Sequence, residues 1–297
     1  MKLAIFDDMR VGVVSVDQRS IVDVTAALPW PHDPDPVGAG WWVRLCRDLA
    51  SLRTPLEEAA RGGRATPISK AKLRAPVLNP GKIVACAVNY AEHAAEMAAV
   101  HERVGGDRPA WLMKFGVFLK APSSIIGPAD AVVLPPVPVS EGREIHHESE
   151  LAFVVGKGGA NIPEANALDH IAGYTIGLDM TVRGEGDRSQ RKSYDTFTPI
   201  GPWLTTTDEI ADPHALRITL SVNGQTRQDV DTATMSVRIP AIVAFASSVM
   251  RLDPGDVVLT GSPPGVGRVQ VGDVLETSIT GLGSMRLHVI PGSDKQG

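Results

Sequence analysis

Residues 146–155 read HHESELAFVV, and this stretch places charged side chains directly against an apolar run. The apolar run predicts a buried strand. Because successive side chains of a strand point to opposite faces, Glu148 and Glu150 would share one face and Ser149 would lie on the other. Like charges side by side are destabilising unless a cation or a cationic side chain neutralises them. The pair is therefore either a solvated strand edge or part of a cation site.

The composition of the whole chain is typical of a globular protein, since 43% of its 297 residues are hydrophobic and 21% are charged. The net charge is -5 and no block of like charge stands out. This argues against a nucleic-acid surface or a polybasic membrane patch. There is no apolar run long enough for a membrane span and no signal-peptide pattern. Cys46 and Cys86 are too few for a disulfide framework, so we expect a cytoplasmic protein.

The spread of 29 glycines and 23 prolines indicates many short elements joined by tight turns. We therefore expect a mixed α+β, β-rich fold. Residues 1–75 are expected to form a small N-terminal α/β accessory domain, with a helix at 41–61. Residues 76–297 are expected to form a second, β-rich domain.

Hydrophobic periodicity places the main elements of the second domain. The Asn-Gly pair at 223–224 predicts a hairpin within 216–228, because both residues tolerate the left-handed backbone of a tight turn. An apolar stripe from residue 239 to residue 250 predicts a helix, with Pro-Gly beyond its end. Further strands are expected at 83–88, 111–122, 149–157, 173–182, 256–267 and 272–290, and a helix at 89–100.

A third carboxylate strengthens the case for a cation site. Asp179 follows the apolar run IAGYTIGL, where a lone carboxylate is normally a cap or a turn residue. Together with Glu148 and Glu150 it would supply three hard oxygen donors, which suit Mg²⁺, Mn²⁺ or Ca²⁺ better than Zn²⁺. The zinc pattern H-E-x-x-H is absent. His146 and His147 are expected to be solvated or hydrogen-bonded rather than to bind metal.

The segment NYAEHAAEM, residues 89–97, contains a candidate acid–base pair. His93 and Glu96 are three residues apart, so on a helical turn they lie on one face. A carboxylate there would orient the imidazole and raise its basicity, as a general base near neutral pH requires. The alternative is an exposed polar face of an alanine-rich helix, because Glu92 lies on it too.

The segment RKSYDTFTPIGPW, residues 191–203, contains a candidate ligand-binding lysine. An irregular path rich in proline and glycine is expected to follow Lys192 and to hold it at a cleft. A fixed lysine beside a metal suits an enolate, a keto acid or a carboxylate. The alternative is a surface lysine. Neither a phosphate-binding glycine loop nor a G-x-S-x-G elbow occurs, so nucleotide chemistry and a serine triad are poorly supported.

Eight collinear segments between about residues 80 and 290 together resemble the fumarylacetoacetate hydrolase family. A collinear set is far more specific than any one motif. The segments are GKIVACAVNYAEHAAEM, FLKAPSSIIGP, HHESELAFVVGK, GYTIGLDMTVR, KSYDTFTPIGPW, VNGQTRQ, LDPGDVVLTGSPPGVG and VGDVLE.

The resemblance implies a β-roll catalytic core in residues 76–297 that is usually dimeric and binds Mg²⁺ or Mn²⁺, with Ca²⁺ a further ion in crystals. By motif, the metal ligands fall on Glu148, Glu150 and Asp179. The other implied site residues are the dyad His93 and Glu96, the ligand-contacting Lys192, and the substrate-binding residues Arg183, Tyr90, Lys120 and Thr260.

Two departures from the family pattern concern the substrate and one turn. Family members often continue after the arginine with Asp and a nearby Gln, whereas here Gly184 follows Arg183. Gln190 is a candidate for the place of that glutamine. Because this loop borders the substrate, the substrate identity is left open. Ser262 stands where Thr is commoner, a mild change that should preserve the turn.

The resemblance implies a divalent-metal-dependent enzyme that hydrolyses a C–C bond of acylpyruvate-type 2,4-diketo acids, such as fumarylpyruvate or fumarylacetoacetate, in the catabolism of aromatic compounds. The same metal–enolate site supports isomerisation or decarboxylation of 2-hydroxy-diene-dioates and decarboxylation of oxaloacetate, and a fold does not choose among them. Two rivals from other classes are a non-catalytic metal- and ligand-binding member and a calcium-stabilised structural domain. The expected partners are a small keto acid and a second copy of the chain.

Overall fold

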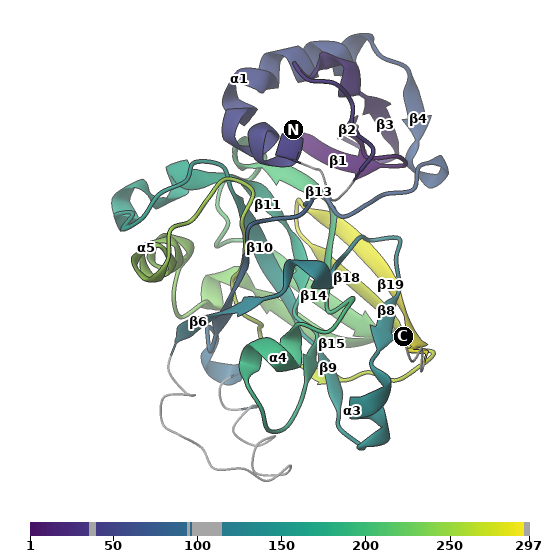
Figure 1. Cartoon of the computed structure of the whole chain (residues 1–297), viewed down its shortest axis with the longest axis vertical. Coiled ribbons are helices and arrows are strands. Elements are labelled where there is room, and N and C mark those ends of the chain that lie inside the picture. Colours follow the sequence, from purple (N-terminus) through teal and green to yellow (C-terminus); the bar gives the residue numbers. More distant parts are fainter. Residues whose placement is uncertain (36–39, 94–95, 97–114, 294–297) are drawn as a thin grey trace.

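The structure is a computed structural model, and it describes residues 1–35, 40–93, 96 and 115–293. Within these ranges the strands form three sheets. Figure 1 shows the N-terminal strands and helix at one end of the molecule and the bulk of the strands below them. The large sheet has the order β4 (Ala65–Pro67), β3 (Ser20–Asp23), β2 (Arg10–Val14), β1 (Lys2–Phe6), β13 (Thr198–Thr206), β11 (Ile171–Leu178), β10 (Ser149–Val155), β16 (Val257–Leu259), β5 (Ile83–Ala87) and β6 (Gly116–Lys120), while β7 (Ile125–Ile126) pairs with β13.

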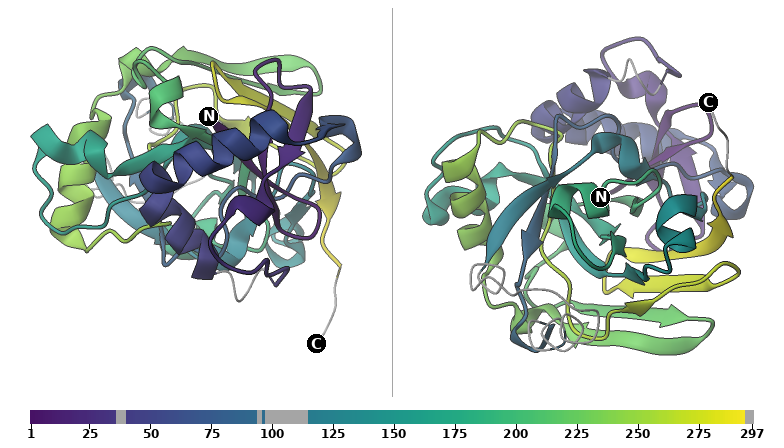
Figure 2. Two further views of the ribbon diagram at one scale, coloured as in Figure 1. Left: turned by 90° about the horizontal axis from the view of Figure 1, so that it is seen from above. Right: turned by 60° about the horizontal axis from the view of Figure 1, so that its bottom comes forward.

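Two smaller sheets and several helices complete the described fold, and Figure 2 shows them from two further sides. The five-stranded sheet has the order β15 (Gln225–Asp231), β14 (Arg217–Val222), β18 (Val274–Ile279), β19 (Gly283–Pro291) and β8 (Val132–Leu134); the three-stranded sheet has the order β12 (Thr181–Val182), β9 (Ile145–His147) and β17 (Gly267–Arg268). The helices are α1 (Gly40–Gly62), α3 (Pro136–Ser140), α4 (Arg188–Lys192) and α5 (Ile239–Val249), and the 3₁₀ turns are η1 (Thr25–Ala27), η2 (Ile68–Lys70), η4 (Pro122–Ser124), η5 (Glu164–His170), η6 (Thr207–Glu209) and η7 (Thr232–Thr234).

The strands confirm the expected mixed α+β, β-rich fold. Every residue of β10 is buried, because β11 and β16 pair with it on either side and apolar layers cover both faces. The hairpin β14–β15 turns at Asn223 and Gly224, whose φ angles are 52° and 77°. These positive angles are the ones that an Asn-Gly hairpin turn requires. No helix in the described ranges is long and apolar enough to cross a membrane.

The N-terminal strands continue the large sheet rather than forming a separate one. β1 pairs with β2 on one side and with β13 on the other. Helix α1 confirms the helix expected at 41–61, and its buried stripe includes Trp42, Leu45 and Leu56. These side chains belong to one apolar cluster with residues of β5, β10 and β16. The division at residue 75 stays a prediction.

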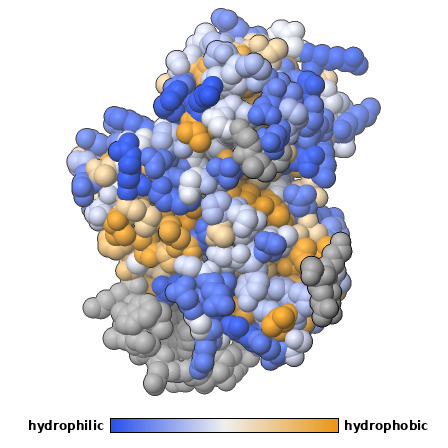
Figure 3. Space-filling model, viewed as in Figure 1, coloured by the Kyte–Doolittle hydropathy of each residue, from blue (hydrophilic) through white to orange (hydrophobic). Residues whose placement is uncertain are grey.

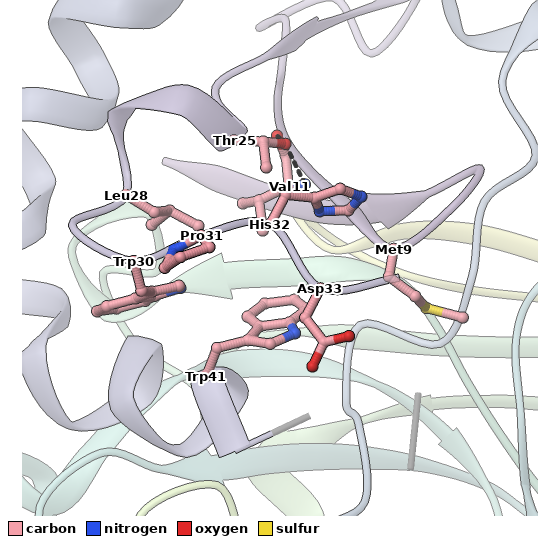
Figure 4. A pocket seen from close by; sticks show the side chains of 9 residues that line it. All are labelled: Met9, Val11, Thr25, Leu28, Trp30, Pro31, His32, Asp33 and Trp41. Carbon is pink, nitrogen blue, oxygen red and sulfur yellow. Dashed lines mark hydrogen bonds between the residues drawn. The ribbon is translucent and has the colours of Figure 1, made fainter. Parts of the chain in front are cut away.

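The cavity drawn in Figure 4 lies inside the N-terminal unit. Its volume is ≈ 10 Å³, about enough for a single water molecule. The Thr25 hydroxyl on its wall already accepts the backbone N–H of Val11 at 3.0 Å. The cavity is therefore a packing gap between loop and helix. Its walls are Met9, Val11, Thr25, Leu28, Trp30, Pro31, His32, Asp33 and Trp41.

The irregular path expected across residues 191–203 is partly wrong. β13 occupies its second half and continues to Thr206, between β1 and β11 in the large sheet. Pro199 and Pro202 made this stretch read as a loop, because proline cannot donate to a ladder. The ladder between β11 and β13 shifts register between Tyr174 and Ile176. Such a bulge is one of the few places where a strand tolerates proline.

Two other expectations fall partly outside the described residues. In the helix expected at 89–100, residues 91–93 and residue 96 are helical, whereas 94–95 and 97–100 are not described. In the strand expected at 111–122, residues 111–114 are not described and β6 covers Gly116–Lys120.

Candidate active site

Three buried carboxylates meet where β10 and β11 come together. Glu148 directly precedes β10, Glu150 lies within it, and Asp179 directly follows β11. The strands are antiparallel with Ser149 opposite Leu178, so the start of one meets the end of the other. The backbone N–H of Asp179 donates to the carbonyl oxygen of Glu148 at 2.8 Å, and one oxygen from each carboxylate lies within 4.8 Å of the others.

Three cations from other elements surround these carboxylates. Lys120 at the end of β6 has its Nζ 2.6 Å from Asp179 Oδ1. Lys192 at the end of α4 has its Nζ 2.7 Å from Glu148 Oε2 and also contacts Asp179. Arg183 pairs with the other oxygen of Glu148. Each lysine is buried, and a buried charge persists only when it is paired.

The three carboxylates differ in how far their charge is balanced. Burial opposes ionisation of Glu148, but Lys192 and Arg183 hold its pKa well below the usual range. Burial and then the neighbouring Asp179 raise the pKa of Glu150 well above the usual range. In the described part of the chain Glu150 has no ion-pair partner; its Oε2 accepts the backbone N–H of Gly261 at 2.6 Å. A hard divalent cation fits this all-oxygen set and would supply the missing positive charge.

The dyad residues lie close together beside a glycine turn. His93 is buried, and its Nδ1 lies 3.6 Å from Glu96 Oε2. The backbone N–H of Gly265 donates to both oxygens of Glu96, at 2.8 Å and 3.0 Å. Burial opposes ionisation of Glu96, yet His93 and the Gly265 N–H lower its pKa. Glu96 is thus an anion held in a fixed place beside the imidazole.

The predicted substrate-binding residues have different surroundings. Tyr90 is buried, its hydroxyl has no hydrogen-bond partner within the described ranges, and burial followed by the charge of Glu150 raises its pKa. Thr260 is fully buried, and its hydroxyl donates to the carbonyl oxygen of Leu151 at 2.8 Å. The hydroxyl of Thr260 therefore braces β10. The substrate roles of both residues stay predictions.

His146 and His147 are buried, so the solvated alternative for them is wrong. Burial, followed by the charge of Arg183, lowers the pKa of His146 to about 4. Its Nε2 lies 2.9 Å from Glu144 Oε2, which confirms the hydrogen-bonded alternative. Burial also lowers the pKa of His147 to about 4. Both imidazoles are therefore neutral near pH 7.

Sequence reasoning gave no role to Gln228, which connects β10 to the glycine turn. This side chain is fully buried. Its Oε1 accepts the backbone N–H of Ser149 at 3.0 Å, and its Nε2 donates to Ser262 Oγ at 3.1 Å and to the Pro263 carbonyl at 3.0 Å. The hairpin register could have identified this residue, because it places Gln228 opposite Leu220 on the buried face of the sheet. A glutamine at a buried position indicates a polar network.

The loop that departs from the family pattern is held by two arginines. Arg143 donates from Nε and from a terminal nitrogen to the carbonyls of Arg183 and Glu185, at 3.2 Å and 3.0 Å. Arg191 likewise donates to the carbonyls of residues 186 and 182, at 3.1 Å and 3.0 Å. Asp187 caps α4 by accepting the Ser189 N–H at 2.8 Å. Gln190 is exposed, and its place in substrate binding stays a prediction.

Comparison with known proteins identifies the family. The sequence pattern described as "Fumarylacetoacetate (FAA) hydrolase C-terminal" matches residues 82–290. The chain therefore belongs to the fumarylacetoacetate hydrolase family.

Two relatives and one solved structure show the range within this family. A maleylpyruvate hydrolase of Aquipseudomonas alcaligenes is 39% identical over 97% of this chain and 99% of its own length. A mitochondrial oxaloacetate tautomerase of Xenopus laevis is 38% identical over 95% of this chain and 86% of its own length. The crystal structure of a maleylpyruvate hydrolase from Sphingobium sp. SYK-6, in complex with manganese(II) and pyruvate, is 41% identical and superimposes with a TM-score of 0.85 over 99% of this chain and 100% of that one. This likeness confirms the expected fold type.

Proposed function

We propose that this protein is a Mg²⁺- or Mn²⁺-dependent enzyme that hydrolyses the C–C bond of acylpyruvates, with maleylpyruvate as the first substrate to test. The observation that carries the proposal is the buried Glu148–Glu150–Asp179 triad, in which Glu150 has no cationic partner within the described ranges. The relatives named maleylpyruvate hydrolase cover nearly the whole chain and support the same choice.

In the proposed mechanism the triad holds the metal. When bound, the divalent ion supplies Lewis-acid polarisation of the 2-oxo acid. Lys192 and Arg183, both paired with Glu148, lie where they can offset negative charge that develops on the substrate oxygens. These preorganised charges need no rearrangement during the reaction, since other elements already hold them in place.

His93 and Glu96 are proposed to move the protons. His93 Nδ1 faces Glu96, which leaves Nε2 to take a proton from the attacking water. Water adds to the carbonyl of the acyl part, and the bond between that carbon and the adjacent methylene breaks. The acyl part leaves as a carboxylic acid. The proton held by His93 is then delivered to the methylene carbon, which becomes the methyl group of pyruvate.

Proton transfer without hydrolysis is a second candidate function. The same dyad can move a proton between carbon and oxygen of an oxo acid when no water attacks. The 38% identity to an oxaloacetate tautomerase over 95% of this chain supports this candidate. Isomerisation of dienedioates and decarboxylation of oxaloacetate belong with this candidate, because each of these reactions forms an enolate without attack by water.

The test is an assay of the purified protein with maleylpyruvate, acetylpyruvate and oxaloacetate, with Mg²⁺ or Mn²⁺ and with EDTA. Pyruvate release is expected from an acylpyruvate, and it should stop with EDTA. Glu150→Gln should lower kcat/KM by at least about 10³-fold through loss of a metal ligand, while Glu276→Gln, at an exposed position, should not. Tautomerisation of oxaloacetate without pyruvate release would favour the second candidate. Metal-independent hydrolysis would contradict the proposal.

We also propose that the enzyme works as a homodimer in the cytoplasm. Figure 3 shows hydrophobic residues gathered on the surface around α5. Among the exposed apolar side chains are Phe245 and Val249 of α5 and Leu119 of β6, and burying them would favour self-association. Light scattering of the purified protein measures the assembly.

The cysteines support the cytoplasmic location. Cys46 and Cys86 are both free and buried, as expected in a reducing compartment.

A further inference from the structure

Arg188 stands beside the triad on the same helix as Lys192. The two residues are four apart in α4, so their side chains leave the helix on one face. The guanidinium carbon of Arg188 lies 5.6 Å from the centroid of the Phe118 ring, and Lys192 Nζ lies 5.3 Å from the same centroid. Because Lys192 also contacts Glu148 and Asp179, Arg188 is on the side of the helix that faces these carboxylates.

The hydrogen-bonding capacity of Arg188 is unused within the described ranges. Arg143 and Arg191 donate to backbone carbonyls of the loop, and Arg183 pairs with Glu148. Arg188 is half-buried, and no hydrogen bond or ion pair joins it to another described residue. A guanidinium has five N–H donors, and none of those of Arg188 is sealed from solvent, so a ligand can reach them. The side chain is thus ready to receive an anion.

The charges of the site favour an anion with more than one negative charge. Burial lowers the pKa of Arg188, and the attraction of Glu148 and Asp179 opposes this shift. The cations Lys120, Lys192 and Arg183 equal the three carboxylates in number, although the ion pairs they form are with Glu148 and Asp179 only. A divalent ion and Arg188 therefore add positive charge that a singly charged ligand would not neutralise.

We propose that Arg188 binds the distal carboxylate of a dicarboxylic 2-oxo acid whose oxo-acid end lies at the triad. The planar fork of a guanidinium pairs with a carboxylate through two parallel hydrogen bonds, and the guanidinium carbon of Arg188 lies over the Phe118 ring. The inference rests on the proposed function and narrows it to acylpyruvates whose acyl part ends in a carboxylate. The sequence departs from the family pattern in this loop, which is where a change of substrate would arise.

Binding of two non-hydrolysable ligands of equal length tests this proposal without requiring turnover. The seven-carbon acid 2-oxoheptanedioate carries a carboxylate at its far end, and 2-oxoheptanoate carries a methyl group there. Calorimetric titration of Mn²⁺-loaded wild-type protein should show tighter binding of the diacid by about 10- to 100-fold, the size of one charge-assisted contact. Arg188→Ala should remove this preference by weakening the diacid alone, and Arg188→Lys should keep part of it.

Arg19→Ala is the matched control, because it removes an exposed arginine from a turn of the N-terminal unit and should leave the preference unchanged. The proposal is overturned if wild-type protein shows no preference for the diacid, or if Arg188→Ala weakens both ligands equally. If the protein hydrolyses acylpyruvates but binds the two acids equally well, the proposed function stands and the role of Arg188 is wrong. If the protein prefers the diacid but hydrolyses no acylpyruvate, the role of Arg188 stands and the proposed hydrolysis is wrong.

Discussion

Two of the places where carboxylates pair with cations in the described part of the chain differ in burial. In the active-site cluster of Glu148, Asp179 and Lys192, each side chain is at most 8% exposed. At the junction of α1 with η6, the side chains of Arg53 and Asp208 are 38% and 39% exposed. Buried charges pay a desolvation cost that their attraction rarely exceeds, whereas an exposed pair contributes at most about 1 kcal/mol. The contrast indicates that the buried cluster is kept for binding or chemistry rather than for stability.

Among the variants that test this contrast between ion pairs, the largest effect is expected from Lys192→Met. This change removes the cation shared by Glu148 and Asp179 and leaves their negative charge without that compensation. By analogy with removal of one preorganised donor, kcat/KM should fall by about 10²- to 10³-fold. Steady-state kinetics with the best acylpyruvate measures the change. Lys157→Met, at an exposed position, is the control, and equal losses in both variants would break the contrast between buried and exposed charges.

A smaller effect is expected from Gly265→Ala, which tests how tightly the dyad is held. A Cβ at Gly265 would lie 1.9 Å from the carbonyl oxygen of Arg227, so the turn that holds Glu96 must move. A displacement of about 1 Å can lower kcat/KM by about 10²-fold. Gly272→Ala is a matched control, because its φ of +93° equals the +92° of Gly265 within a degree, yet no atom lies within 4 Å of its Cβ. Equal losses of activity in both variants would show that backbone strain alone is responsible.

The smallest effect is expected from Asp208→Asn at the exposed pair. Arg53 holds the pKa of Asp208 well below its usual range. The ionised pair therefore adds stability at pH values above the ordinary pKa of aspartate, about 3.9, and this stability is lost as the pH falls below it. Because the pair is partly exposed, we expect at most about 1 kcal/mol at pH 7 and no change in activity. Urea titrations at pH 7 and pH 3 should show that the variant loses less stability on acidification than the wild type. An equal loss in both proteins would contradict this.

The elements that the sequence predicted best are those with an unambiguous period or turn. The buried run of β10, the stripe of α1 and the Asn-Gly turn at 223–224 each specify one local conformation. β13 was missed because Pro202 lies where its ladder with β11 shifts register, and such a shift is a tertiary feature that local sequence does not contain.

The site was only partly predictable for a related reason. The residue types of Glu148, Glu150 and Asp179 suggested a cation, and the resemblance named them together. Their partners come from distant parts of the chain: Lys120 lies 59 residues before Asp179. The contact of Gly265 with Glu96 spans 169 residues. Such pairings depend on how the strands are ordered in the sheet, so a single sequence does not reveal them.

The pairing of β1 with β13 has a consequence for how this family can change in evolution. The N-terminal unit covers an edge of β13 and shares an apolar cluster with Ala152, Val154 and Leu259 of the large sheet. A lineage that lost this unit would expose a strand edge and apolar side chains, both of which promote aggregation. Loss or gain of the unit should therefore be accompanied by substitutions on that face of the sheet, far from the catalytic carboxylates.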